Sequence, residues 1–175
     1  MSSFLIDGRA FAEKLVSNVG NAVETLIKDH GLKPGLAVVL VGDNPASEVY
    51  VRNKVKQTEK AGMVSIEHRL PDTTSESELI ALVNNLNNNE DIDGILVQLP
   101  LPNHIDENSI INTISPSKDV DGFSIPNVGL LSTSGDGLIP CTPLGCLLLL
   151  KDFLGDLTGK TAVIIGRSNI VGKPM

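Results

Sequence analysis

The residue pair with the clearest capacity for chemistry is Tyr50 and Lys54, in which the only tyrosine of this 175-residue chain precedes a lysine by one helical turn. Residues at i and i+4 share a helix face, so both side chains are expected at one border of a cleft. A lysine held partly desolvated there, or beside Lys56 or Arg52, has its charged form disfavoured and can act as an acid or base near neutral pH. The structural alternative is a packed ring beneath a solvated ammonium.

A turn and a helix are predicted to position this pair. Residues 42–45 (GDNP) are typical of a turn, and Ser47 is expected to cap a helix that runs to about Gly62. The turn follows residues 36–41, a continuous apolar run typical of a strand buried on both faces of a parallel sheet. Ligands of such sheets bind outside the carboxyl ends of the strands, where this helix begins.

Gln98 is a further candidate for the same site. It lies near the end of residues 92–99 (IDGILVQL), which we predict to form a strand that stops at a Pro-Leu-Pro sequence. Its side-chain carbonyl could accept a hydrogen bond from Lys54. The alternative is a glutamine at a strand end that bonds to nearby backbone.

Asp121 lies in a predicted loop, residues 115–123. Its carboxylate could pair with the N–H groups of a heterocycle, or it could cap the turn before Gly122. Asp119 stands close by, but no further ligands at loop spacing complete a metal site of the EF-hand type, so no metal is predicted.

A second candidate site follows residues 161–165, which we predict to form a last buried strand. Gly166, Arg167, Ser168 and Gly172 then give a glycine turn and the expected start of a helix, an arrangement that binds phosphate on backbone N–H groups. The pattern departs from GxGxxG. Arg167 and Ser168 would suit a ribose that carries a 2′-phosphate, which favours NADP over NAD. The sequence ends soon afterwards, so we interpret the chain as a fragment that holds one complete lobe and the opening of another.

Strands and helices are predicted to alternate along the chain, which indicates an α/β fold with a mainly parallel sheet. The predicted strands are residues 36–41, 64–70, 92–99 and 161–165. The predicted helices are residues 11–30, 47–62, 76–87, 105–114 and 144–154, the third of them with a capping box that starts at Ser75.

Composition excludes several classes of protein. A net charge of −7 without a basic run argues against nucleic acid as the main partner, and no apolar run approaches the length needed to span a membrane. Cys141 and Cys146 fit neither CxxC nor a zinc motif and are expected to be reduced thiols in the core. A cytoplasmic location is expected, since no apolar leader sequence precedes the first helix.

Five segments together resemble the bifunctional methylenetetrahydrofolate dehydrogenase/methenyltetrahydrofolate cyclohydrolase family, in the order that the family has them. They are YVRNK at 50–54, VQLPLP at 97–102, KDVDGF at 118–123, PCTPLG at 140–145 and GRSNIVGKPM at 166–175. The resemblance covers essentially the whole chain. It implies an enzyme that oxidises methylenetetrahydrofolate with NADP and hydrolyses the methenyl product to formyltetrahydrofolate.

The resemblance also implies roles for matched residues. Lys54 would be the general acid/base of hydrolysis, and Gln98 would hydrogen-bond to it and help to set its protonation. Tyr50 would stack on the folate, and Asp121 would accept hydrogen bonds from the pterin. The implied substrate contacts are Tyr50, Val51, Arg52, Asn53, Lys54, Val97, Gln98, Leu99 and Asp121. The implied nucleotide contacts are Gly166, Arg167, Ser168 and Gly172.

The resemblance divides the chain into a folate-binding catalytic domain at 1–121, an α/β/α lobe, and a partial Rossmann-type NADP-binding domain at 122–175. It implies tetrahydrofolate derivatives as ligands, and a homodimer in the full-length form. Two alternatives stay open: an oxidoreductase of the same architecture with another substrate, and a truncated, non-catalytic folate-binding or assembly module.

Overall fold

The structure, a computed structural model, describes residues 5–175 and contains a parallel sheet of three strands. The strand order is β2-β1-β3, with β1 at Gly35–Val41, β2 at Val64–Leu70 and β3 at Gly94–Val97. An isolated bridge between Ile95 and Asp119 extends the sheet beyond β3. The central strand is therefore buried by a neighbour on each side, as its unbroken apolar run predicted.

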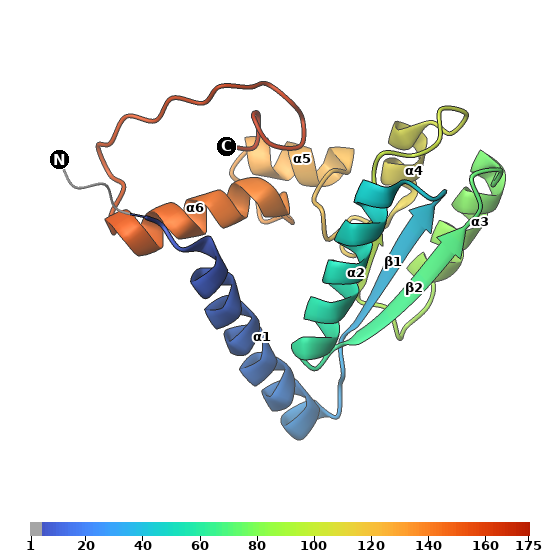
Figure 1. Ribbon diagram of the computed structural model, residues 1–175, viewed down its shortest axis with the longest axis horizontal. Coiled ribbons are helices and arrows are strands. Elements are labelled where there is room, and N and C mark those ends of the chain that lie inside the picture. Colours follow the sequence, from blue (N-terminus) through green and yellow to red (C-terminus); the bar gives the residue numbers. More distant parts are fainter. Residues whose placement is uncertain (1–4) are drawn as a thin grey trace.

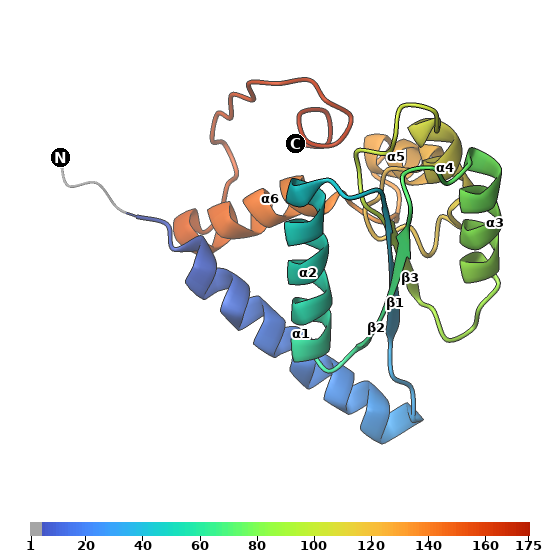
Figure 2. The same ribbon diagram turned by 45° about the vertical axis from the view of Figure 1, so that its right-hand side comes forward.

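The two faces of the sheet are covered by helices, and Figure 2 shows the sheet nearly edge-on between α2 (Pro45–Lys60) and α3 (Glu76–Asn87). Side chains alternate between the faces of a strand. Val38 and Leu40 accordingly belong to the core cluster on the α2 side. The larger cluster, on the side of α3 and α4 (Glu107–Thr113), contains Ala37, Val39, Val41, Leu79, Val83, Leu86, Ile92, Ile95, Val97, Leu101, Ile105, Ile110 and Ile114.

The helix caps agree with the sequence at two ends and differ at one. α1 (Gly8–His30) ends at Gly31, whose φ of 68° is left-handed, and α3 begins with the predicted capping box at Ser75. The predicted cap of α2 was wrong, because Asn44 rather than Ser47 accepts the N–H groups of the first turn. Proline occupies the first helical position after that asparagine, so α2 starts earlier than expected and buries Ser47.

The segment after the sheet contains one helix that the sequence did not predict. α5 (Ile125–Ser132) begins with a proline in its first turn and follows Ser124. α6 (Cys141–Leu154) starts three residues before the predicted helix, and Figure 1 shows it crossing toward the N-terminal end of α1. These helices place Cys141 and Asn127 near the loop that carries Asp121, as described below.

Residues 161–165 do not form the predicted strand. They are exposed and irregular, and in Figure 1 the chain after α6 arches back as a coil. A parallel strand is stable only when a neighbour satisfies its N–H and C=O groups, and the described residues place no strand beside this segment. The apolar pattern alone therefore did not decide its structure.

None of the helices in residues 5–175 combines the length and the apolar character that a membrane crossing requires.

Candidate active site

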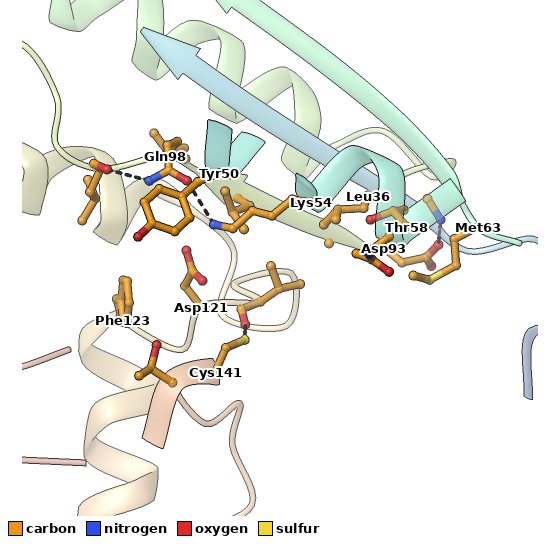
Figure 3. A pocket seen from close by; sticks show the side chains of 18 of the residues that line it. Leu36, Tyr50, Lys54, Thr58, Met63, Asp93, Gln98, Asp121, Phe123 and Cys141 are labelled. Atoms are coloured by element: carbon orange, nitrogen blue, oxygen red, sulfur yellow. Dashed lines mark hydrogen bonds between the residues drawn. The ribbon is translucent and has the colours of Figure 1, made fainter. Parts of the chain in front are cut away.

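A pocket of about 800 Å³ lies beside the face of the sheet that α2 covers. Tyr50 and Lys54 line it from α2, Gln98 from the end of β3, Asp121 from the following loop and Cys141 from the start of α6 (Figure 3). The structure thus brings together four of the side chains that sequence analysis selected, although they come from three separate parts of the chain.

Lys54 and Gln98 are joined directly. The Nζ atom of Lys54 donates a hydrogen bond of 3.1 Å to Oε1 of Gln98, and both residues are partly buried. The Nε2 atom of Gln98 donates to the backbone carbonyl of Leu99 at 2.6 Å, so both alternatives for this glutamine occur at once. This second bond orients the amide with its oxygen toward the lysine.

Tyr50 lies at the mouth of the pocket and is 61% exposed. Figure 3 shows its ring beside Gln98, with the Lys54 ammonium and the Asp121 carboxylate turned toward the same space. A largely exposed aromatic ring at a pocket mouth offers a flat face on which a planar heterocycle can stack.

Asp121 places a carboxyl group in the pocket, near Lys54. Burial is the largest influence on its carboxyl and raises the pKa; the nearby Lys54 ammonium lowers it, and Asp119 raises it further. The pKa of Asp121 is raised overall. Its carboxyl group can therefore exchange between an acceptor of hydrogen bonds and a donor more readily than a solvated aspartate.

The two cysteines differ from the prediction, because both residues are exposed and neither lies in the core. Cys146 faces solvent, because most residues of α6 are exposed or only partly buried. The Cys141 thiol instead turns to the pocket wall and donates a hydrogen bond of 3.4 Å to the carbonyl of Val120. Burial, followed by the charge of Asp121, raises the pKa of this thiol.

The predicted substrate contacts divide into two groups. Val97 and Leu99 line the pocket together with Gln98. Val51 does not, because its side chain is fully buried against the sheet, and Arg52 and Asn53 are exposed outside the pocket lining. A helix turns by about 100° per residue, so only the i and i+4 positions of the YVRNK segment can face one pocket.

Several residues of the pocket lining were not selected from the sequence. Leu36, Thr58, Met63, Asp93, Phe123 and Thr142 line the wall between α2, the sheet and α6. Phe123 and Thr142 lie within segments that carried the family resemblance, which was the one indication available from the sequence.

The glycine turn that follows residue 165 is closely packed. A Cβ atom on Gly172 would overlap the carbonyl group of Gly166, so this position accepts only glycine. The hydroxyl of Ser168 accepts hydrogen bonds from the N–H groups of Val171 and Gly172 at 3.0 and 3.3 Å, as in the capped first turn of a helix. Of residues 166–172, Ile170 alone is part of the pocket lining.

Comparisons with known proteins agree with this geometry. The family model described as tetrahydrofolate dehydrogenase/cyclohydrolase, catalytic domain, matches residues 6–121, and the model for the NAD(P)-binding domain of the same enzymes matches residues 140–175. The chain is 60% identical over 175 residues to bifunctional protein FolD 1 of Roseobacter denitrificans and covers 58% of that protein. It is also 60% identical to bifunctional protein FolD of Erythrobacter litoralis, of which it covers 59%.

Solved structures give the same result. The bifunctional FolD enzyme of Campylobacter jejuni superimposes with a TM-score of 0.95 at 48% identity, over 99% of this chain and 62% of that one. The Trypanosoma brucei FolD enzyme, solved with NADP cofactor and inhibitor, superimposes with a TM-score of 0.94 at 34% identity, over 99% of this chain and 60% of that one. The chain thus spans about three fifths of the length of these relatives. It belongs to the tetrahydrofolate dehydrogenase/cyclohydrolase family.

Proposed function

We propose that the protein hydrolyses methenyltetrahydrofolate to formyltetrahydrofolate at the pocket of Lys54, and that the longer enzyme of which this chain corresponds to a part also oxidises methylenetetrahydrofolate to the methenyl form. The observation that carries the proposal is the hydrogen bond of 3.1 Å between Lys54 and Gln98 inside a pocket of about 800 Å³. A pocket of this size accommodates a drug-sized heterocycle.

The ligand is proposed to bind with its pterin ring against Tyr50 and toward Asp121. The exposed tyrosine ring supplies stacking, and the Asp121 carboxylate accepts hydrogen bonds from the N–H groups of the pterin. The raised pKa of Asp121 fits a group that gains hydrogen-bond donors only when ligand binds. The backbone of Val97 to Leu99 forms the adjoining wall.

Lys54 is proposed to move the proton of the hydrolytic step. The methenyl carbon already carries positive charge, so water can attack it without a further electrophile. Nζ of Lys54 in its neutral form takes a proton from the attacking water and then returns one to the nitrogen that leaves. Gln98 holds the amine in the pocket and, being uncharged, does not stabilise the ammonium form as a carboxylate would.

The dehydrogenase step requires NADP, which supplies the acceptor for a hydride from the folate carbon when it is bound. Gly166, Arg167, Ser168 and Gly172 are proposed to hold its phosphates and ribose. The fit is supported by the close approach of Gly172 to Gly166, which leaves room for backbone alone, and by the exposed position of Arg167. The proposed hydrolytic groups, in contrast, all lie between Tyr50 and Asp121.

Further proposals follow from family membership and charge. The chain comprises a catalytic domain at 1–121 and part of an NADP-binding domain at 122–175, and the full-length enzyme is a cytoplasmic homodimer. The net charge of −7 supports a small-molecule ligand rather than nucleic acid.

The decisive experiment follows the loss of methenyltetrahydrofolate absorbance with the parent chain, Lys54→Ala and the control Lys56→Ala. Lys56 is exposed and lies outside the pocket lining, so its removal tests the loss of a charge alone. We expect the parent and Lys56→Ala to hydrolyse the substrate and Lys54→Ala to be slower by about 100-fold or more. Equal rates in parent and Lys54→Ala would remove Lys54 from the mechanism.

A further inference from the structure

The loop that presents Asp121 is fixed on both sides of that residue. The N–H of Ile95 in β3 donates to the carbonyl of Lys118 at 2.7 Å, and the Cys141 thiol donates to the carbonyl of Val120 at 3.4 Å. The N–H of Gly122 closes the turn onto the carbonyl of Asp119 at 3.0 Å. Among the polar side chains of residues 118–122, that of Asp121 alone lines the pocket, and it has no hydrogen-bond partner among the described residues.

A buried carboxylate holds this loop onto α5. Asp119 is 1% exposed, and its Oδ2 atom accepts hydrogen bonds from the backbone N–H of Ser124 at 2.8 Å and from Nδ2 of Asn127 at 3.0 Å. No ion pair among the described residues involves Asp119. Burial of a carboxylate without a cation is costly, and two N–H donors are what makes it tolerable here.

Asn127 completes the connection and is 2% exposed. Besides its bond to Asp119, its Nδ2 atom donates to the carbonyl of Pro116 at 2.9 Å, and its Oδ1 atom accepts from the N–H of Leu138 at 3.1 Å. One amide therefore ties together the segment before the loop, the carboxylate within it and the segment that leads into α6.

We propose that Asp119 and Asn127 are positioning residues, whose buried hydrogen-bonded pair sets the place and direction of Asp121 in the pocket. The inference rests on the proposed folate-binding role of Asp121. A simple apolar contact would have anchored the loop at lower desolvation cost, whereas a pair with directional bonds fixes its register.

Electrostatics connect the same residues. The groups that face Asp121 are Lys54 from α2, Asp119 from its own loop and the Cys141 thiol from α6. Burial raises the pKa of Asp121, and the charge of Asp119 adds to the rise. A loop released from α5 would carry Asp121 toward solvent, so the pKa of its carboxyl should fall toward the ordinary value.

The test uses Asn127→Ala and the exchanged pair Asp119→Asn/Asn127→Asp, with Asn112→Ala as the matched control. Asn112 accepts a hydrogen bond from the N–H of Ile125 at the start of the same helix and donates one to the carbonyl of Asn108, so neither bond reaches residues 118–122. The titration of Asp121 is followed by carbon NMR of labelled aspartate, with the signal assigned by its loss in Asp121→Asn. Affinity for tetrahydrofolate and thermal unfolding are measured on the same samples.

We expect folded Asn127→Ala to show a lower pKa for Asp121 and about tenfold weaker folate binding, and Asn112→Ala to match the parent in both. The exchanged pair keeps one carboxylate and one amide in contact, so it should recover part of both properties. A folded Asn127→Ala with the titration and affinity of the parent would overturn the proposal. If Asn127→Ala does not fold, the milder Asn127→Ser decides: a pKa of Asp121 that falls toward the ordinary value supports the inference, and the titration of the parent contradicts it.

The NMR titration needs no folate. A parent chain that binds no folate would refute the proposed function, while the Asp121 titration in the variants would still decide the positioning role.

Discussion

The Nζ atom of Lys54 donates to Oε1 of Gln98 across 3.1 Å, although 44 residues separate them in the chain. Lys54 lies on α2, the helix that follows β1, and Gln98 is the first residue after β3. Since β1 pairs with β3 in parallel, both residues come after the carboxyl ends of neighbouring strands. The parallel pairing thus makes the contact a consequence of the fold. A substitution of the Gln98 side chain should therefore change the balance between the ammonium and amine forms of Lys54 without changing the sheet.

Gln98→Glu is expected to slow hydrolysis of methenyltetrahydrofolate at pH 7 by about tenfold or more, because a carboxylate beside Lys54 stabilises its ammonium form. The rate should recover partly as the pH rises and the amine loses its proton. A pH–rate profile from pH 6 to 9 measures this. Gln57→Glu adds a negative charge at another position of the pocket lining, but there Gln98 keeps its hydrogen bond to Lys54, so this control should shift the profile less than Gln98→Glu. An unchanged profile in Gln98→Glu would contradict the role of this hydrogen bond.

Asp121→Asn is expected to weaken folate binding by about tenfold or more while leaving the protein as stable as the parent, or more stable, at pH 7. The folded-state pKa of Asp121 is raised, so its ionisation disfavours the folded state above the ordinary pKa of 3.8. The advantage of the variant should therefore be largest at neutral pH and disappear as pH falls toward 3.8. Urea unfolding at several pH values measures it, with exposed Asp136→Asn as control. A variant that is less stable than the parent at pH 7 would contradict this account.

Much of the first lobe could be predicted from the sequence because its signals are local. The apolar run of β1, the capping box of α3 and the helical spacing of Tyr50 and Lys54 each specify a structure within a few residues. The contact of Lys54 with Gln98 was foreseeable because strand ends of a parallel sheet lie at one edge.

The remaining features depend on partners that local patterns do not contain. Residues 161–165 are as apolar as a buried strand, yet they are exposed, and no strand within residues 5–175 pairs with them. Asn127 was missed because α5 is short and its sequence, IPNVGLLS, contains proline and glycine. The expected burial of Cys141 and Cys146 failed because an apolar helix need not bury every residue.

Gly94→Ala is expected to displace the Asp121 loop, because a Cβ atom at this position would lie 2.5 Å from Cγ1 of Val120. We expect a loss of roughly 1–3 kcal/mol in the free energy of unfolding, together with weaker folate binding. Adding Val120→Ala removes the overlapping methyl group, so the double variant should bind folate better than Gly94→Ala alone.

Gly145→Ala is the matched control for this pair. Gly145 lies in α6, and outside that helix no atom of the described residues comes within 4 Å of an added Cβ, so alanine should raise stability by about 0.5–1 kcal/mol and leave binding unchanged. Urea unfolding and folate titration report both quantities. Equal folate affinity in Gly94→Ala and the parent would show that the loop absorbs the overlap.

Cys141 and Cys146 are expected to differ in their reaction with iodoacetamide, although both residues are exposed. The thiolate is the reactive form, and burial together with the charge of Asp121 raises the pKa of the Cys141 thiol. Cys146 should therefore be alkylated first at pH 7.5, and tetrahydrofolate should protect Cys141 alone because only Cys141 lines the pocket. Peptide mass spectrometry against time separates the two sites. Asp121→Asn removes one charge that opposes ionisation of the Cys141 thiol, so it should speed the alkylation of Cys141 and leave that of Cys146 unchanged. Protection of both cysteines by folate would instead show that the ligand binds elsewhere.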